Sequence, residues 1–178
     1  AVVLAASSAF AGAPAPKRVV TLWPDVPAQP VTTPELLEVG ERVYKGACLG
    51  CHGEKGDGLG REGKFLAIPP RDFTTGQFIV RTTPLGTLPW DTDLFGSIRR
   101  GFRPGVGMPA FTFLSDREVW GVIAYLKTFS PRFKTEKPGA KVDLPPVPAD
   151  LASMAPQGQV VFMSGGACFV CHGMQGKG

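Results

Sequence analysis

Apolar residues recur at helical spacing in three stretches of the chain, and residues that favour helix ends bound each stretch. The first stretch predicts a helix over about residues 34–50. Thr33 supplies an N-cap and Pro34 suits the first helical turn. Gly40 lies on the apolar face of this helix, where a residue without a side chain would let a second helix approach closely.

Two more helices are predicted further along the chain. One covers residues 91–100 and ends at Gly101. The other opens with a capping box, Ser115 to Glu118, and ends before Pro131. This last helix is expected to cross the first one, with its Trp120 or Tyr125 packed near Gly40. The stretch between the first two helices contains glycine and proline throughout, so the pattern predicts an all-α fold with long irregular loops.

The composition is that of a globular protein. Of the 178 residues, 43% are hydrophobic and 19% are charged, which suits one ordinary domain or two small ones. The 23 glycines and 18 prolines indicate long connections between few regular elements. The net charge is +4, but no dense Lys/Arg block exists, so nucleic acid is not expected as a partner. No run of eighteen apolar residues lies within the given chain, so it contains no complete transmembrane helix.

All cysteines and histidines fall into two copies of one motif, C-x-x-C-H: Cys48, Cys51 and His52 in the first, Cys168, Cys171 and His172 in the second. This motif is typical of haem attachment in c-type cytochromes. The two thiols can add to the two vinyl groups of one porphyrin, and the adjacent histidine can bind its iron. Half of a zinc site, a redox-active pair and a disulfide framework are the alternatives. Zinc-binding pairs usually lie closer together, and disulfides do not require a histidine after each second cysteine, so two covalently attached haem c groups are the favoured cofactors.

Met108 is the predicted distal iron ligand of the first haem. It lies on a glycine-flanked loop and precedes Pro109, which fixes the following turn. A thioether is a soft, neutral iron ligand, and the chain has no third histidine. The alternative is a methionine that fills the core. On the other side of the haem, a backbone carbonyl in residues 69–73 is a candidate acceptor for the free N–H of His52, with a plain turn as the alternative.

The order of these elements resembles class I cytochrome c: a helix, C-x-x-C-H, a proline-bearing loop, Met on a Gly-x-Met-Pro loop and a closing aromatic helix. The resemblance covers residues 33–130 fully and 150–178 as a first fragment. It implies the class I cytochrome c fold followed by a partial second module, as in a tandem dihaem cytochrome of bacterial energy metabolism. It also implies thioether bonds at Cys48 and Cys51, with His52 as the proximal and Met108 as the distal ligand. For the second module only Cys168, Cys171 and His172 can be assigned.

The predicted organisation follows from this resemblance and from a repeat, because similar residues surround the two C-x-x-C-H motifs. Residues 33–130 form the first cytochrome c domain and residues 131–150 a proline-rich linker. The start of a second domain, residues 151–178, is expected to be truncated, because only six residues follow His172. An extended lead-in, 14–32, precedes the first domain. Residues 1–13 resemble the remnant of a signal peptide or of an anchor. Either reading predicts a periplasmic or other extracytoplasmic protein, and an anchor would attach it to the membrane.

Electron transfer is the expected function, with single electrons passing between respiratory redox partners through a dihaem subunit or carrier. Iron with both axial positions filled leaves none for a substrate, so the chain is not expected to be an enzyme by itself, although it suits a subunit of an oxidoreductase complex. A dihaem peroxidase-like enzyme and a haem-bearing structural subunit of a larger assembly are the alternatives. The expected partners are redox proteins or a membrane-associated respiratory complex. Arg99, Arg100 and Arg103 are candidates for the partner surface, or else a solvated face.

Overall fold

The structure is a computed structural model, and it describes residues 18–19, 23, 25–102, 107–144, 149–166 and 168–177. The chain divides into two compact units. One comprises Val19–Asp143, and the other combines Ala1–Arg18 with Leu144–Gly178. The predicted signal-peptide or anchor segment, residues 1–13, lies outside the described residues.

The first predicted helix forms over the expected residues, but its hydrogen bonding changes partway along. Helix α1 spans Pro34–Val43, and the Thr33 hydroxyl accepts a hydrogen bond from the Leu36 amide at 3.3 Å. A π-helical turn, Tyr44–Cys48, follows and leads into α2, Leu49–His52. The wider turn adds a residue to the helical repeat and ends at Cys48, the first cysteine of the C-x-x-C-H motif; such turns are often found at functional sites. The spacing of apolar residues predicts the helix but not this turn.

The other two predicted helices are confirmed. Helix α3 spans Asp91–Arg100 and α4 spans Asp116–Leu126. The capping box of α4 is formed on both sides: the Glu118 amide donates to the Ser115 hydroxyl, and the Ser115 amide donates to the Glu118 carboxylate at 2.7 Å. A 3-10 turn, Lys127–Phe129, extends α4, and the short helix α5, Arg132–Thr135, follows Pro131.

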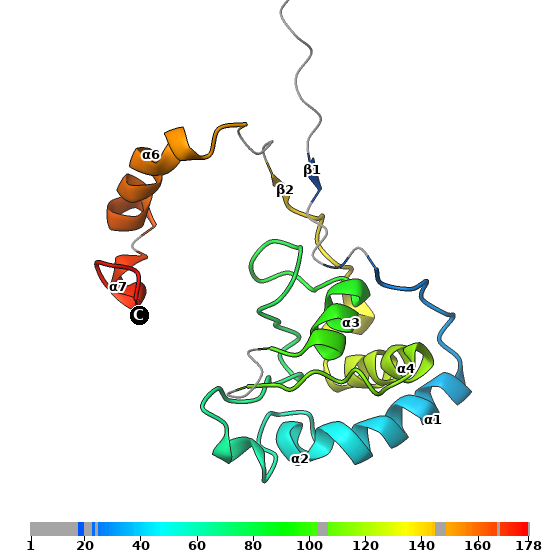
Figure 1. Cartoon of the computed structure of the whole chain (residues 1–178). Coiled ribbons are helices and arrows are strands. Elements are labelled where there is room, and N and C mark those ends of the chain that lie inside the picture. Colours follow the sequence, from blue (N-terminus) through cyan, green and yellow to red (C-terminus); the bar gives the residue numbers. More distant parts are fainter. Residues whose placement is uncertain are drawn as a thin grey trace, which may run out of the picture. The chain divides into compact units, whose positions relative to one another are not determined.

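Helices α1 and α4 cross at a pair of glycines (Figure 1). A Cβ atom placed on Gly40 would lie 2.0 Å from the carbonyl oxygen of Gly121 and 3.0 Å from the Cβ of Tyr125. The two backbones therefore meet at a distance that no side chain permits. The predicted crossing near Gly40 and Tyr125 is confirmed, and Gly121 is the partner that the sequence analysis did not single out.

The core of this unit is formed mainly by α3 and α4. Its buried members come from the helices and the loops that join them, and include Tyr44, Leu94, Phe95, Val119, Trp120, Val122, Ile123 and Leu126. The apolar face of α3, formed by Leu94, Phe95 and Ile98, is buried. The apolar face of α4 is buried as well, with Val119, Val122, Ile123 and Leu126.

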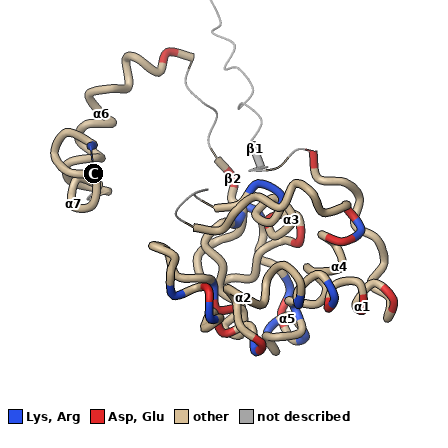
Figure 2. Tube along the Cα trace, turned by 60° about the horizontal axis from the view of Figure 1, so that its bottom comes forward, with Lys and Arg blue, Asp and Glu red and all other residues tan. Residues whose placement is uncertain are grey.

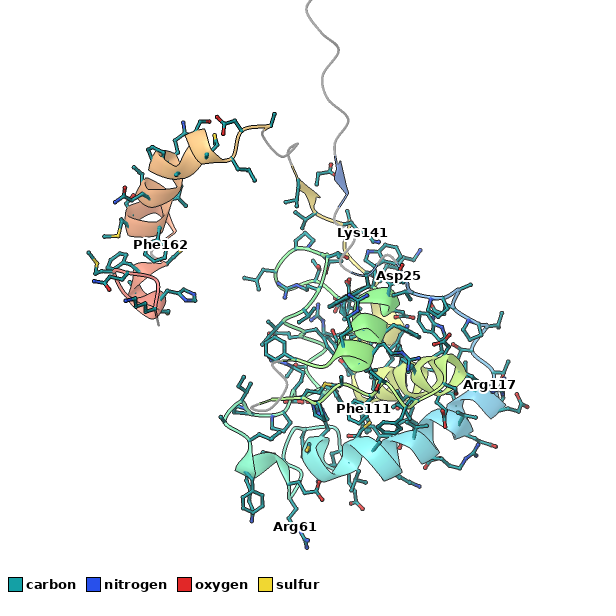
Figure 3. The ribbon with its side chains drawn as sticks, viewed as in Figure 1. Asp25, Arg61, Phe111, Arg117, Lys141 and Phe162 are labelled. Atoms are coloured by element: carbon teal, nitrogen blue, oxygen red, sulfur yellow. The ribbon has the colours of Figure 1, made fainter. Side chains whose placement is uncertain are left out.

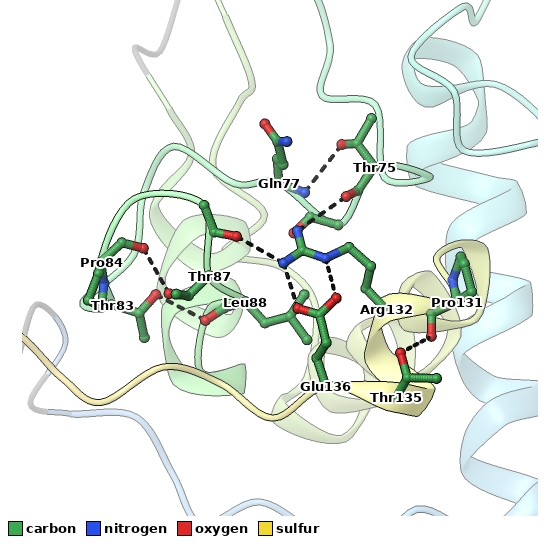
Figure 4. A network of polar contacts seen from close by, with 12 residues as sticks. Thr75, Gln77, Thr83, Pro84, Thr87, Leu88, Pro131, Arg132, Thr135 and Glu136 are labelled. Atoms are coloured by element: carbon green, nitrogen blue, oxygen red, sulfur yellow. Dashed lines mark hydrogen bonds and ion pairs between the residues drawn. The ribbon is translucent and has the colours of Figure 1, made fainter.

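A long loop connects α2 with α3, and its only helical turn among the described residues is the 3-10 turn Gly63–Phe65. The end of this loop is fastened by Arg132 of α5, as Figure 4 shows. The Arg132 guanidinium donates to the Gly86 carbonyl at 2.9 Å and to both carboxylate oxygens of Glu136, at 2.7 and 2.6 Å. It also reaches the carbonyls of Thr75 and Gly76 at 3.5 Å. A segment predicted as linker thus contributes the residue that holds this loop in place.

The C-terminal segment is a broken helix. It comprises a 3-10 turn, Ala152–Met154, then α6, Ala155–Val160, a π-helical turn, Val161–Gly165, and α7, Phe169–His172. Figure 2 shows how few charged residues it carries, and several apolar side chains are exposed along it, among them Leu151, Val160, Val161 and Val170.

Helices dominate the structure, in agreement with the predicted all-α cytochrome c fold. In the part of the chain that the structure describes, the strands are β1, Arg18–Val19, and β2, Asp143–Leu144, which pair with each other. No helix built from described residues is both long enough and apolar enough to cross a membrane.

Candidate haem site

A cavity of about 330 Å³ lies within the unit Val19–Asp143, beside the first C-x-x-C-H motif. Its walls are mostly apolar, and contributors include Phe78, Leu94, Ile98, Phe111, Val122 and Leu126. Phe111 is labelled in Figure 3 and comes from the segment between α3 and α4. Cys48, Cys51, His52 and Met108 all line this cavity. The structure therefore brings together the four residues that the sequence analysis assigned to the first haem.

His52 ends α2 and is buried, with 7% of its surface exposed. Its Nδ1 lies 2.9 Å from the carbonyl oxygen of Arg71. Since a carbonyl only accepts hydrogen bonds, Nδ1 carries the proton and Nε2 is left with its lone pair. Burial lowers the pKa of His52, and the hydrogen bond to Arg71 opposes this effect. A neutral imidazole with a free Nε2 is the form that binds iron. The predicted carbonyl acceptor within residues 69–73 is confirmed, and it is that of Arg71.

Two further contacts hold the turn that follows His52. The buried hydroxyl of Tyr44 donates to the Gly53 carbonyl at 2.7 Å. The Phe73 amide donates to the Gly56 carbonyl at 2.6 Å. Gly53 and Gly56 both have positive φ, 78° and 67°, a conformation that favours glycine. The glycines after the first motif therefore form the tight turn that lets the loop fold back over the histidine.

The two thiols of the first motif are unequal. Burial raises the pKa of Cys48 to about 11, with Cys51 as a smaller contribution. The pKa of Cys51 is also raised, by burial first and then by the nearby Glu62 carboxylate. Both thiols are free and half-buried at the cavity. Their place beside an apolar cavity suits attachment of a planar apolar ring.

Met108 lies beyond α3, on the far side of a loop whose residues 103–106 are outside the described residues. Its backbone is held by an antiparallel bridge with Phe102, whose amide donates to the Met108 carbonyl at 2.9 Å. Gly101, with φ of 74°, approaches so closely that a Cβ there would lie 2.7 Å from that same carbonyl oxygen. A glycine at the end of α3 thus allows the chain to return and present Met108 at the cavity. Its role as an iron ligand remains a prediction.

A second, smaller cavity of about 190 Å³ shares Arg71, Phe78 and Ile79 with the first. Arg81 lines it too, and its guanidinium is held by the Phe78 and Pro84 carbonyls. Among the residues that the structure describes, neither Arg71 nor Arg81 forms an ion pair. Two guanidinium groups therefore line the smaller cavity next to the apolar one, and neither is paired with a carboxylate from the described part of the chain.

Arg99, one of the residues predicted to form the partner surface, is instead bound within the protein. Its guanidinium is bound within the protein, to the Asp116 carboxylate at 2.6 Å and to backbone carbonyls of residues 111, 112 and 114. Arg100 lies over the Trp23 ring at 4.7 Å. Arg103 lies outside the described residues. Arg99 therefore fastens the segment between α3 and α4, because its planar group matches several acceptors at once.

The second C-x-x-C-H motif repeats the local backbone of the first. Cys168, Cys171 and His172 lie at α7, and a π-helical turn precedes α7 as it does α2, although three residues separate the two elements in the second copy and none in the first. Gly173 and Gly176 have φ of 69° and 68°. In both copies, the second of these glycines donates its amide to the carbonyl of the first, at 3.2 and 3.0 Å. Unlike His52, however, His172 is exposed.

The sequence profile of the family described as cytochrome c oxidase, cbb3-type, subunit III matches residues 35–126. The chain belongs to this cytochrome c family. The match spans α1 to the end of α4 and includes every residue assigned to the first haem. Membership identifies a c-type cytochrome, with covalently bound haem c as its cofactor and haem-based electron transfer as its general function.

This cytochrome is also similar to a chain in the solved structure of the reducing HAO-like protein complex of Kuenenia stuttgartiensis. The two are 35% identical, with a TM-score of 0.70, and the similarity covers 86% of the cytochrome described here. This cytochrome spans 66% of the length of that chain. The search of curated proteins returned no significant match.

One residue at the site was not identified from the sequence. Phe73 is buried, and its ring stacks on the His52 imidazole with a centroid distance of 4.3 Å and an angle of 19° between the planes. Its position near the candidate carbonyl segment is visible in the sequence. However, an aromatic residue within a glycine- and proline-rich loop carries no periodic signal that would show which way its ring points.

Proposed function

We propose that Cys48 and Cys51 bind one haem c through thioether bonds and that His52 and Met108 are the two axial ligands of its iron. The observation that carries this proposal is the cavity that all four residues line, with His52 Nδ1 bound to the Arg71 carbonyl. When bound, the iron of such a group takes up and releases one electron at a time. The apolar walls suit a porphyrin, and the guanidinium groups of Arg71 and Arg81 suit its carboxylates.

The surrounding residues would keep the site suited to electron transfer rather than to substrate chemistry. The Arg71 carbonyl makes the imidazole a better electron donor to the iron. A methionine opposite a histidine stabilises the ferrous form, which raises the reduction potential. Apolar walls exclude water from both ligands. With both axial positions filled, no site remains for a substrate, so we propose an electron carrier or an electron-transfer subunit.

We further propose that a second haem c is attached at Cys168 and Cys171, with His172 as an iron ligand. Support comes from the repeated motif and from the shared backbone geometry: the preceding π-helical turn and the two glycines with positive φ that follow. The chain would then be a dihaem cytochrome that passes single electrons between redox partners.

The proposed partners are redox proteins, and the chain would act as a subunit or carrier that serves them. The likeness to a chain of the reducing HAO-like protein complex of Kuenenia stuttgartiensis supports a place in a multi-subunit redox assembly. We also propose that the protein is exported to the periplasm or another extracytoplasmic compartment. The apolar, small-residue sequence of residues 1–13 supports this, as a signal peptide or as a membrane anchor.

Haem counting in matched variants tests the proposal. The full chain is produced with haem-attachment machinery, and the covalent haem per chain is measured from the pyridine haemochrome spectrum and the intact mass. The wild type is expected to carry two haems. Cys48→Ala/Cys51→Ala and Cys168→Ala/Cys171→Ala are each expected to carry one. A wild type with one haem that persists in the second variant contradicts the dihaem proposal alone, whereas a chain without covalent haem contradicts the proposed function altogether.

A further inference from the structure

The His52 imidazole is held by two consecutive features of one short segment. The Arg71 carbonyl accepts its Nδ1 proton at 2.9 Å, and the Phe73 ring lies nearly parallel to its plane, 4.3 Å between centroids. Both rings are buried, with 7% of His52 and 8% of Phe73 exposed. A hydrogen bond along one edge fixes the position of Nδ1, but it allows the ring to swing about that bond. A flat group against the face of the ring removes this remaining freedom.

The segment that carries Phe73 is itself rigidly placed. The Phe73 amide donates to the Gly56 carbonyl at 2.6 Å, which joins it to the turn that follows His52. The carboxylate of Asp72 accepts hydrogen bonds from the Thr74 amide at 2.8 Å and the Thr74 hydroxyl at 2.6 Å. Two further rings lie close to that of Phe73: the centroids of Phe78 and Phe129 are 6.1 and 6.4 Å from its centroid. Phe73 therefore has little room to move when the imidazole pushes against it.

We propose that Phe73 is a positioning residue for the iron ligand: its ring fixes the plane of the His52 imidazole in a single orientation. This inference rests on the proposed role of His52 as an iron ligand. The orientation of an axial imidazole determines how unpaired electron density spreads over a ferric haem. Phe73 would thus set the electronic asymmetry of the first haem without touching the iron.

The competing explanation is that Phe73 only fills space in the core. Two substitutions separate the two roles. Phe73→Leu retains an apolar side chain of similar bulk but lacks a flat face, whereas Phe73→Tyr retains the face. Phe95→Leu is the matched control, because Phe95 is a buried core residue whose ring packs on Trp120 rather than on His52 or Phe73, and it is not among the residues that line the cavity. Phe73→Met supplies a second non-aromatic side chain in case the leucine variant does not fold.

The proton NMR spectrum of the ferric protein gives the readout, because the shifts of the four haem methyl groups report the orientation of the axial imidazole. The measurement uses the full chain carrying Cys168→Ala/Cys171→Ala, so that all shifted signals come from the first haem. Phe73→Leu is expected to change the order of the methyl shifts and to bring the extreme values closer together. Phe73→Tyr and Phe95→Leu are expected to keep the order of the parent protein.

The outcomes distinguish this inference from the function on which it rests. If Phe73→Leu and Phe73→Met keep the order and spread of the methyl shifts, the Arg71 carbonyl alone orients His52 and the inference is wrong. The proposed function would stand in that case. If the parent protein has no covalent haem, or no shifted methyl signals of a low-spin ferric haem, the proposed function fails and the inference fails with it.

Discussion

Without haem, the unit Val19–Asp143 should lose its fixed tertiary structure. The cavity beside His52 lies against the core formed mainly by α3 and α4, and core residues such as Leu94, Val122 and Leu126 line it. These side chains are buried against one another on one side and face the haem position on the other. Withholding the haem removes the partner of that second face while it leaves every protein contact intact.

The size of the cavity sets the magnitude. Cavities in protein cores destabilise by about 24 cal/mol per Å³, so a cavity of about 330 Å³ corresponds to about 8 kcal/mol. This value is an upper bound, because water fills any part of the cavity that opens to solvent. Domains of this size are stable by about 5–15 kcal/mol. At this upper bound, the missing haem would cancel between about half and all of the free energy of unfolding.

The unmodified polypeptide, produced without haem attachment and kept reduced, is compared with the haem-loaded chain by circular dichroism and thermal unfolding. Partial far-UV helical signal is expected, with loss of near-UV signal and of the cooperative transition. Cys168→Ala/Cys171→Ala is the matched control. Its substituted residues lie outside the buried core, so the transition of the haem-loaded unit Val19–Asp143 should stay within a few degrees of the wild type.

The reasoning would be refuted by a haem-free chain that keeps its near-UV signal and unfolds cooperatively at nearly the temperature of the loaded chain. Such a result would mean that the side chains close the cavity by themselves. The haem would then be an addition to a finished core rather than a part of it.

Three further predictions concern the protein frame. Gly40→Ala should destabilise the folded protein by about 2–4 kcal/mol, because the added Cβ would lie 2.0 Å from the Gly121 carbonyl oxygen. Gly46→Ala is the control, because a Cβ at Gly46 would meet nothing within 4 Å. Equal melting temperatures for the two variants would contradict the close crossing of α1 and α4. Tyr44→Phe tests a buried hydroxyl whose pKa is raised by burial. Protonated Tyr44 stabilises the fold, so the wild type should lose stability above about pH 10, where an unfolded tyrosine ionises. Between pH 9 and pH 11, urea titrations should show a smaller loss of stability for Tyr44→Phe than for the wild type. Equal losses in the two proteins would contradict the role given to the Tyr44 hydroxyl. Arg132→Lys should lower the stability by about 1–2 kcal/mol and increase amide hydrogen exchange in residues 75–87, because a lysine cannot donate to several carbonyl groups at once as the guanidinium does. Unchanged exchange in these residues would show that other contacts hold the loop.

The sequence predicts those parts of the fold whose signal is local. Periodic apolar residues locate α1, α3 and α4, and end signals such as Thr33, Ser115 and Pro131 place their limits within a few residues. Gly40 in α1 also predicts the close crossing of α1 with α4. The sequence does not predict the hydrogen-bonding pattern within a helix. The π-helical turn Tyr44–Cys48 depends on packing and hydrogen bonding, which the spacing of apolar residues does not indicate.

The haem site divides in the same way. Four residues of the proposed haem site, all of which line the cavity, are predictable because the proposed chemistry needs particular side chains: two thiols, an imidazole and a thioether. The Arg71 carbonyl was predictable only as one among several in residues 69–73, since backbone carbonyls look alike in a sequence. Phe73 and Arg132 escaped prediction because their roles depend on how a long loop folds back. Arg99 shows the opposite failure, since a charge expected to face a partner turns inward to backbone carbonyls.

The axial ligation of the first haem is the central claim, and near-infrared absorption tests it most directly. The ferric full chain carrying Cys168→Ala/Cys171→Ala is compared with the same chain carrying Met108→Leu as well. The account predicts covalent haem in both proteins, with the weak methionine-to-iron band present in the first and absent from the second. A covalently loaded protein that lacks this band, or one that keeps it after Met108 is replaced, would contradict the assignment of His52 and Met108 as the ligand pair.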